Sequence, residues 1–249
     1  MSAPVFLVEG AELPEQGTYL LDGPEGRHAG VVQRRGVGER IDVVDGSGVR
    51  LVGVVRDVSA AGVLLDVVDR VLEPEPSPRL VLVQALAKGD RDEMAVEAAT
   101  EVGADAVVPW QADRSIVVWR GDRAAKSRAR WVSTVRSATK QSRRTRMPDV
   151  DGALDTKALA VRVEQVVVGG GVALVLHEEA TEPIGAVRLP VRGDVLVVVG
   201  PEGGIGDDEV ARLVGAGAVT VRLGPHVLRT STAGPVALAL LAQRLGRWG

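Results

Sequence analysis

The pattern of apolar and polar positions changes near residue 73 of this 249-residue chain. Before that point, "ERIDVVDGSGVRLVGVVRDV" and "GVLLDVVDRVL" carry short apolar runs, and the "DGSG" at 45–48 is typical of a hairpin turn. The stretch "EPEPSPR" at 73–79 then alternates proline with charged and small residues, which suits neither a helix nor a sheet. We therefore expect a small β-rich domain at 1–73 and a second domain at 77–249.

After this linker, apolar runs alternate with amphipathic stretches. The run "LVLVQAL" at 80–86 is typical of a strand buried on both faces. A helix is expected next, with an N-cap at Asp90, a capping-box Glu93 and a terminal Gly103. The alternation predicts an α/β domain with a mostly parallel sheet covered on both faces. Further strands are expected at 106–110, 172–178, 194–200 and 218–224, with helices over "DDEVARLVGAG" and "GPVALALLAQRLGRW".

Composition narrows the possible chemistry. The chain has no cysteine and only three histidines (His28, His177 and His226), so thiol chemistry is excluded and no metal site is expected. The apolar runs are shorter than the roughly eighteen residues of a membrane span, and the N-terminus lacks a signal-peptide pattern. With 45% apolar and 25% charged residues, the composition is that of a globular protein, which we expect in the cytoplasm.

Three loops are predicted to lie together. Ligands of parallel sheets bind beyond the carboxyl ends of the strands, and the loops at 176–180, 200–204 and 223–234 occupy that position. The chemistry of the middle loop, "GPEGG", therefore decides which ligand the sheet can hold.

The middle loop does not match the common phosphate-binding motifs. It lacks the lysine of a P-loop, and Glu209 occupies the place of the third glycine of a dinucleotide fingerprint. Glu202, Asp207 and Asp208 would repel a phosphate, while the two aspartates can serve as caps and dipole partners of the next helix. The loop favours a neutral or cationic ligand. A simple tight turn without a ligand is the alternative.

Four motifs in this order resemble the RsmE family of SPOUT-class RNA methyltransferases, which methylate N3 of a uridine in 16S ribosomal RNA. The N-terminal "GRHAGVVQRRGVGERIDVVDGSG" resembles that family's PUA-like RNA-binding barrel. The resemblance implies an S-adenosylmethionine site in a deep trefoil knot, a homodimer, and contacts to small-subunit ribosomal RNA from both domains. The four motifs are "ALAKGDRDEMAVEAATEVGADAVVPWQADRS", "RWVSTVRSATKQSRRTRMPDV", "LVVVGPEGGIGDDEV" and "LGPHVLRTSTAGPVALAL".

The cofactor that the resemblance implies fits the loop chemistry. S-adenosylmethionine carries a sulfonium and an ammonium group rather than a pyrophosphate, so a carboxylate beside closely approaching glycine backbone suits it. For His177, a packing role is the alternative. The residues expected to bind the cofactor are Leu176, His177, Gly200, Pro201, Glu202, Gly203, Leu223, Gly224, Leu228, Thr230 and Thr232.

Two catalytic candidates follow from the implied reaction. Uridine N3 must lose a proton as it attacks the methyl group, and Arg229 is expected to stabilise the resulting negative charge with its fixed donors. Glu202 is a candidate base, but capping the next turn or pairing across a dimer is an equal alternative. The family usually has an acid where this chain has Ser231, so no base is expected at that position.

RNA binding is expected in spite of the net charge of −3. The segment 120–146 is strongly basic, with only Asp122 opposing it, although a solvated helix face is the alternative. Aromatic residues are too few for a base-stacking platform, so recognition should rely on phosphates and RNA shape. The expected RNA-binding residues are Arg27, His28, Arg34, Lys88, Arg114, Lys140, Arg143, Arg144 and Arg146.

Two other functions fit the same sequence. Because fold and cofactor do not fix the acceptor, the chain could methylate a different RNA or a protein. It could also be an RNA-binding assembly factor without catalytic activity, since the acid in the third loop is missing. Methyl transfer to small ribosomal subunits distinguishes these functions.

Overall fold

In the computed structural model of the chain, residues 3–248 are described, and they form two compact units. The first comprises the residues up to Glu75 together with Thr139–Met147, and the second comprises Pro76–Ala138 and the residues from Pro148 onward. The boundary between Glu75 and Pro76 falls inside the proline-rich linker. The segment Thr139–Met147 belongs to the first unit, whereas the sequence had led us to assign it to the second.

The first unit is built on a five-stranded sheet with the order β1-β3-β4-β5-β2. Strand β1 is parallel to β3, and the other neighbours are antiparallel. The expected turn at 45–48 joins β3 to β4, where Asp45 Oδ1 accepts hydrogen bonds from the backbone N–H groups of Ser47, Gly48 and Val49. The elements are β1 (Val5–Leu7), β2 (Thr18–Leu21), α1 (Gly23–Arg27), the π-helix η1 (His28–Val32), β3 (Arg40–Val44), β4 (Val49–Ser59) and β5 (Gly62–Leu72).

The segment Thr139–Met147 is tied to this sheet by polar contacts. Arg50 on β4 donates through Nη2 to the carbonyl oxygen of Arg143 at 2.7 Å and to Thr145 Oγ1 at 2.9 Å. Lys140 Nζ lies 2.6 and 2.8 Å from the two carboxylate oxygens of Glu25. These contacts join residues about a hundred positions apart. For that reason sequence patterns did not reveal them.

The second unit contains the predicted parallel sheet. Its strands run in the order β12-β10-β11-β6-β7-β8, β9 also pairs with β7, and every pair is parallel. The central strands β11 and β6 read "DVLVVV" and "RLVLVQA" and are almost wholly buried, as continuous apolar runs predict. The strands are β6 (Arg79–Ala85), β7 (Ala106–Gln111), β8 (Asp149–Val150), β9 (Leu154–Asp155), β10 (Val172–Leu176), β11 (Asp194–Val199) and β12 (Val219–Val221).

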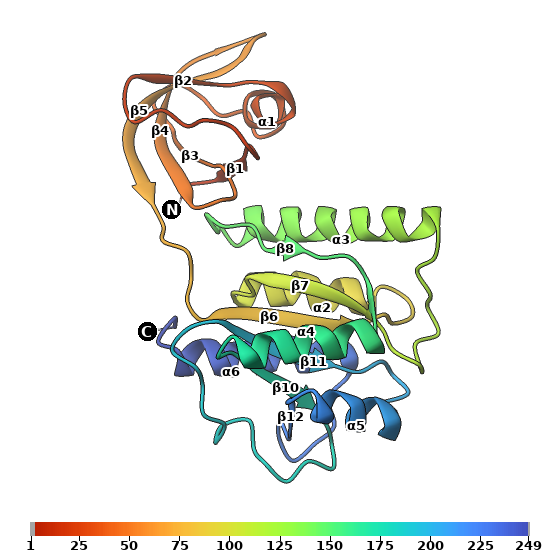
Figure 1. Ribbon diagram of the computed structural model, residues 1–249. Helices are drawn as coiled ribbons and strands as arrows, with labels where there is room; N and C mark the ends of the chain where they lie inside the picture. The colour runs from red at the N-terminus through yellow and green to blue at the C-terminus, as the bar shows by residue number, and fades with distance from the viewer. Residues whose placement is uncertain (1–2, 249) are drawn as a thin grey trace. The chain divides into compact units, whose positions relative to one another are not determined.

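Helices cover both faces of this sheet (Figure 1). Helices α2 and α6 pack together against β6 and β11, while α4 packs against β10 and α5 lies beside α4 and β12. The predicted α/β class is therefore confirmed. The helices are α2 (Arg91–Val102), α3 (Asp122–Gln141), α4 (Thr156–Val168), α5 (Asp207–Gly215) and α6 (Thr230–Arg244). No helix in residues 3–248 is both long enough and apolar enough to cross a membrane.

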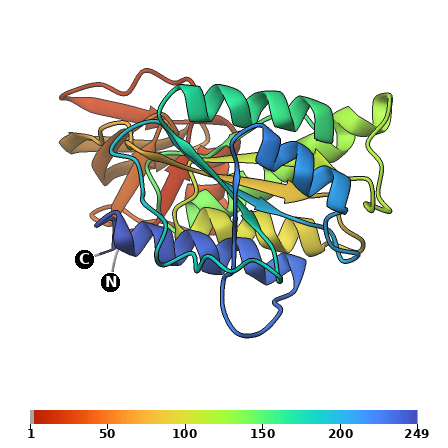
Figure 2. The same ribbon diagram turned by 60° about the horizontal axis from the view of Figure 1, so that its bottom comes forward.

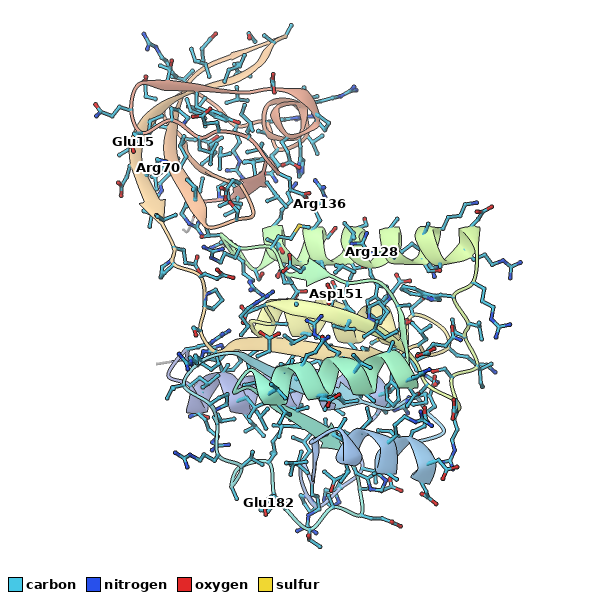
Figure 3. The ribbon with its side chains drawn as sticks, viewed as in Figure 1. Glu15, Arg70, Arg128, Arg136, Asp151 and Glu182 are labelled. Atoms are coloured by element: carbon cyan, nitrogen blue, oxygen red, sulfur yellow. The ribbon has the colours of Figure 1, made fainter. Side chains whose placement is uncertain are left out.

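Helix α3 is anchored through one buried tryptophan, while several of its exposed positions are basic. Trp131 is buried and meets Trp119 edge to face at 5.3 Å between ring centroids. Arg128 Nε donates to the carbonyl oxygens of Val150 at 3.0 Å and Asp151 at 3.2 Å (Figure 3). Arg123, Lys126, Arg128 and Arg130 are exposed on this helix, and the tryptophan packs its longer part into the second unit.

The start of α2 differs from the sequence prediction. Asp90 has a left-handed backbone (φ 60°) and its side chain makes no capping hydrogen bond, so it is not the expected side-chain cap. Gly89, the preceding residue, is also left-handed, with φ 57°. Glu93 pairs with Arg130 rather than forming a capping box. The expected terminal Gly103 is present, with φ 108°.

Candidate functional site

The three loops predicted to lie together do line one cavity of about 800 Å³ in the second unit. The cavity opens beyond the carboxyl ends of β10, β11 and β12, where a parallel sheet places its ligands. Of the residues expected to bind a cofactor, all except Thr232 line this cavity. Thr232 lies in the first turn of α6, where its backbone N–H donates to the carbonyl oxygen of Arg229.

Gly200 is required by close packing at the start of the "GPEGG" loop. A Cβ atom at Gly200 would lie 2.6 Å from Ile205 Cγ1, a separation that real Cβ atoms do not show. Gly204 has φ +73°, which disfavours any residue with a side chain. Gly203 is different, because a Cβ there would only touch Arg114 Cβ at 3.4 Å. Gly200 and Gly204 therefore shape the loop, while Gly203 leaves space on its exposed side.

Helix α5, which follows the loop, is capped by Glu209 rather than by the aspartates. Its N-cap is Gly206, whose N–H donates to Glu209 Oε2 at 3.2 Å. The other carboxylate oxygen of Glu209 accepts from Thr156 Oγ1 at 2.6 Å and from the Asp113 N–H at 3.0 Å. Asp207 and Asp208 occupy the first turn, as helix-dipole partners should. Their expected capping role is therefore wrong.

Glu202 is held by a cation that sequence reasoning missed. Its Oε1 accepts from Arg91 Nη1 at 2.6 Å and from the backbone N–H of Lys88 at 3.1 Å. Burial raises the pKa of Glu202, but hydrogen bonds from backbone groups and from Arg91 outweigh it and the pKa is lowered overall. The carboxylate is therefore ionised and paired within its own chain. The basic "KGDR" after β6 was the available signal for this partner.

Arg229 stands at the N-cap position of α6 and lines the cavity. Its carbonyl oxygen accepts from the N–H groups of Thr232 at 2.8 Å and Ala233 at 2.9 Å, so its backbone is fixed. Within residues 3–248, its guanidinium makes no hydrogen bond or ion pair, and the residue is exposed. Glu202 is paired with Arg91 and not with Arg229, so the side chain is free to meet a ligand.

The third loop is exposed from Gly224 to Arg229 and extends away from the sheet between β12 and α6 (Figure 2). The start of the loop, at Arg222, is hydrogen-bonded to the segment around Glu182, which is labelled in Figure 3. The Arg222 N–H donates to the carbonyl oxygen of Glu182 at 2.8 Å, and the Ile184 N–H donates to that of Arg222 at 3.0 Å. The loop thus begins from a fixed point and leaves its tip accessible.

Charged side chains of both signs surround the cavity. The cations allow contact with carboxylate or carbonyl groups, and the anions allow contact with ammonium or sulfonium groups. His177 Nδ1 accepts from the Glu179 N–H at 3.3 Å, which leaves its Nε2 as a donor when the ring is neutral. Besides Arg229, the charged and histidine side chains of the lining that the sequence analysis did not name as cofactor-binding are Arg91, Arg114, Glu178, Glu179, Asp207, Arg222 and His226.

The basic residues expected to bind RNA are distributed over both units. In the first unit Arg27, Arg34 and Arg143 are exposed, whereas Lys140 pairs with Glu25 and Arg146 donates to the carbonyl oxygens at 73 and 74. His28 packs its ring against Phe6, at 5.8 Å between ring centroids. In the second unit Lys88 is exposed, and Arg114 Nη1 donates to the Gly203 carbonyl at 3.0 Å. Arg144 is half-buried in the first unit.

Comparison with known proteins gives consistent matches. Residues 73–242 match the RNA methyltransferase domain family. The chain is 47% identical over 249 residues to ribosomal RNA small subunit methyltransferase E of Mycobacterium tuberculosis (strain CDC 1551 / Oshkosh), covering 100% of this chain and 94% of that protein. It is 31% identical over 239 residues to the protein of the same name from Bacillus subtilis (strain 168), covering 93% of this chain and 92% of that protein.

Two solved structures are similar over nearly their whole length. One is a ribosomal RNA small subunit methyltransferase E from Neisseria gonorrhoeae bound to S-adenosylmethionine, with a TM-score of 0.84 and 27% identity over 98% of both chains. The other is a putative methyltransferase from Legionella pneumophila in complex with the same cofactor, with a TM-score of 0.79 and 27% identity over 98% of both chains.

Proposed function

The chain belongs to the RNA methyltransferase domain family and, within it, to the ribosomal RNA small subunit methyltransferase E proteins, and on this premise we propose that it methylates N3 of a specific uridine in 16S ribosomal RNA. S-adenosylmethionine is the cofactor, as in the two similar structures that contain it. The observation that carries the proposal is the meeting of three loops around one cavity beside Arg229, whose guanidinium has no partner within residues 3–248.

The residues of the cavity fit S-adenosylmethionine. Its volume of about 800 Å³ lies within the usual range for small-molecule sites. Gly203 and Gly204 are exposed, so the ligand can approach the main chain closely. The carboxylates of Glu178, Glu179 and Asp207 can attract the sulfonium and ammonium groups. The accessible backbone of the third loop can bind the adenine edge by hydrogen bonds.

The reaction requires stabilisation of a negative charge. The bound cofactor supplies an electrophilic methyl group. When uridine N3 loses its proton, charge spreads to the flanking carbonyl oxygens, and the Arg229 guanidinium is suited to hold it because it stays protonated and offers several donors. Glu202 is not the base in this proposal, since Arg91 holds its carboxylate and its pKa is lowered. Its role is to tie the "GPEGG" loop to the start of α2.

We assign RNA binding to exposed basic positions in both units. Arg27, Arg34 and Arg143 supply it in the first unit, the PUA-like barrel of the proposal, and Arg120, Arg123 and Lys126 supply it around the start of α3. Their exposure supports phosphate contacts, because a solvated cation can exchange water for a phosphate oxygen without breaking an internal ion pair. Lys140 and Arg146 are excluded from this role, because they are engaged within the first unit.

We also propose a homodimer with a knotted C-terminal region, acting in the cytoplasm. Val236 and Leu240 on α6 and Met94 on α2 are exposed apolar side chains on two helices that pack together, and a second copy could cover them. After the edge strand β12, the chain returns as α6 to pack on the central strands β6 and β11. Such a return path is compatible with a knot, which also requires the chain to pass through one of its own loops.

Methyl transfer to small ribosomal subunits tests the proposed function. Subunits from cells that lack this protein are incubated with methyl-labelled S-adenosylmethionine and either wild-type protein or Arg229→Ala. We expect label in 16S ribosomal RNA with wild-type protein and a strong reduction with the variant. Binding of subunits without transfer by wild-type protein would instead indicate an assembly factor. Label in another RNA or in a protein would indicate a different acceptor.

A further inference from the structure

A single polar residue, Gln84, interrupts the apolar run of β6. It has no exposed surface, and its neighbours in the sheet are Val199 on β11 and Pro109 on β7. Burying an amide in an apolar sheet costs free energy unless its polar atoms are hydrogen-bonded. Its Oε1 has no partner among residues 3–248, so part of this cost remains. The contacts of its amide nitrogen give the residue a role.

Gln84 begins a relay of two hydrogen bonds. Its Nε2 donates to Thr230 Oγ1 at 2.8 Å, and Thr230 Oγ1 donates to the carbonyl oxygen of Gly200 at 2.7 Å. The same Nε2 also lies 3.2 Å from the carbonyl oxygen of Ala85. The carbonyl oxygens of Ala85 and Gly200 can only accept hydrogen bonds. The Thr230 hydroxyl therefore donates its one proton to Gly200 and accepts a hydrogen bond from the Gln84 amide, which fixes the direction of the relay.

The relay joins three parts of the cofactor cavity's framework. Gln84 is near the end of β6, Gly200 opens the "GPEGG" loop, and Thr230 is the first residue of α6, directly after Arg229. Gly200 and Thr230 line the cavity, whereas Gln84 does not. Thr230 was expected to bind the cofactor, but its hydroxyl already donates to Gly200 and accepts from Gln84.

We propose that Gln84 is a positioning residue for cofactor binding, acting through the Thr230 hydroxyl to set the spacing between the "GPEGG" loop and the start of α6. The packing around the relay leaves little freedom for another arrangement. A Cβ at Gly234 in α6 would lie 2.7 Å from Leu82 Cδ1, so the helix already presses on β6. Thr230 is 7% exposed. Gln84 itself has no exposed surface, so water has poor access to replace a partner that its amide loses.

The test measures S-adenosylmethionine affinity by calorimetry, at a temperature well below the melting temperature of each variant. Gln84→Leu removes the amide, Thr230→Val removes the hydroxyl at similar volume, and Thr230→Ser is the matched control that keeps it. We expect each of the first two variants to weaken binding roughly tenfold, the size of one neutral hydrogen bond. Thr230→Ser should stay within about threefold of wild type because the relay is intact.

The double variant Gln84→Leu/Thr230→Val separates positioning from general destabilisation. Because both residues act through one relay, the second change should add little to the first, whereas independent effects would multiply. The proposal is overturned if folded Gln84→Leu and Thr230→Val bind the cofactor like wild type and only melt earlier. It is also overturned if the two effects multiply. The calorimetric titration measures S-adenosylmethionine binding and needs no RNA acceptor. A result that overturns the role of Gln84 is therefore distinct from a result that overturns the proposed methyl transfer.

Discussion

Replacing Gly200 with Ala should damage both the fold and the cofactor site. The new Cβ would lie 2.6 Å from Ile205 Cγ1 and 3.4 Å from Ile205 Cδ1. Ile205 is 6% exposed and belongs to the core of the second unit, so any movement of its side chain disturbs core packing. Restoring an ordinary contact requires the 200–205 loop to move by nearly an ångström. Overpacking of this kind costs about 1–3 kcal/mol.

Urea unfolding and calorimetric titration with S-adenosylmethionine measure the two effects of Gly200→Ala. We expect the free energy of unfolding to fall by about 1–3 kcal/mol and cofactor affinity to fall at least tenfold, because the displaced loop lines the cavity. In the double variant Gly200→Ala/Ile205→Ala, the atom that clashes is gone, so the loss of stability should be smaller than the sum of the single losses.

Gly203→Val is the matched control on the same loop. The space at Gly203 allows a Cβ at 3.4 Å from Arg114 Cβ, so the fold should survive while the branched side chain obstructs the ligand. Wild-type stability and affinity in Gly200→Ala would refute the packing argument. Wild-type affinity in Gly203→Val would remove that face of the loop from the cofactor site.

Three further predictions concern charged residues. Arg229→Ala should lower single-turnover methyl transfer roughly a hundredfold to a thousandfold while cofactor affinity and melting temperature stay near wild type, and Arg229→Lys should recover part of the rate. If both variants transfer methyl at the wild-type rate, Arg229 is not catalytic. Arg143 has a left-handed backbone (φ 58°), which asparagine tolerates, so Arg143→Asn removes the charge without straining the chain. This variant should reduce the salt dependence of RNA binding by about one phosphate contact, and Arg143→Lys is the control that keeps the charge. An unchanged salt slope would mean that Arg143 does not touch phosphate. Because the pKa of Glu202 lies below its ordinary 4.5, its pairing stabilises the fold above that pH and is lost as pH falls through the lowered pKa. The difference in melting temperature between wild type and Glu202→Gln should therefore be constant from pH 8 to about 5 and shrink below about 4.5, and a constant difference down to pH 3 would contradict this.

The parts of the fold that the sequence predicted are those with strong local signals. The runs at 80–86 and 194–200 predicted buried parallel strands, and three loops at the carboxyl edge of the sheet predicted the cavity. Helix α6 begins at Thr230 and includes Pro235 in its second turn, so the expected start near Gly234 was a few residues late. Pro235 lies past the first turn, so the carbonyl oxygen of Ser231 lacks its usual α-helical donor.

The contacts that sequence patterns missed join distant residues. Arg91 and Glu202 are 111 positions apart, and Gln84 and Thr230 are 146 apart. The periodicity of apolar residues within a short sequence window carries no information about such distant pairs. Helix α4 was missed for another reason, because its "TKALAVRVEQVVV" is rich in β-branched residues that weaken a helical signal. The continuous basic run at 120–146 likewise gave no sign of the boundary between the two units, which falls within α3 between Ala138 and Thr139.

The most direct test of the proposed function is the identity of the methylated nucleoside. Small subunits from cells lacking the protein are methylated with the purified wild-type protein, and the 16S ribosomal RNA is digested and analysed by mass spectrometry against nucleoside standards. We predict 3-methyluridine at one position, absent when the protein or S-adenosylmethionine is omitted. A methyl group on a ribose, on uridine C5 or on another base would contradict the uridine-N3 assignment, and no added methyl group in the RNA would contradict the enzymatic function itself.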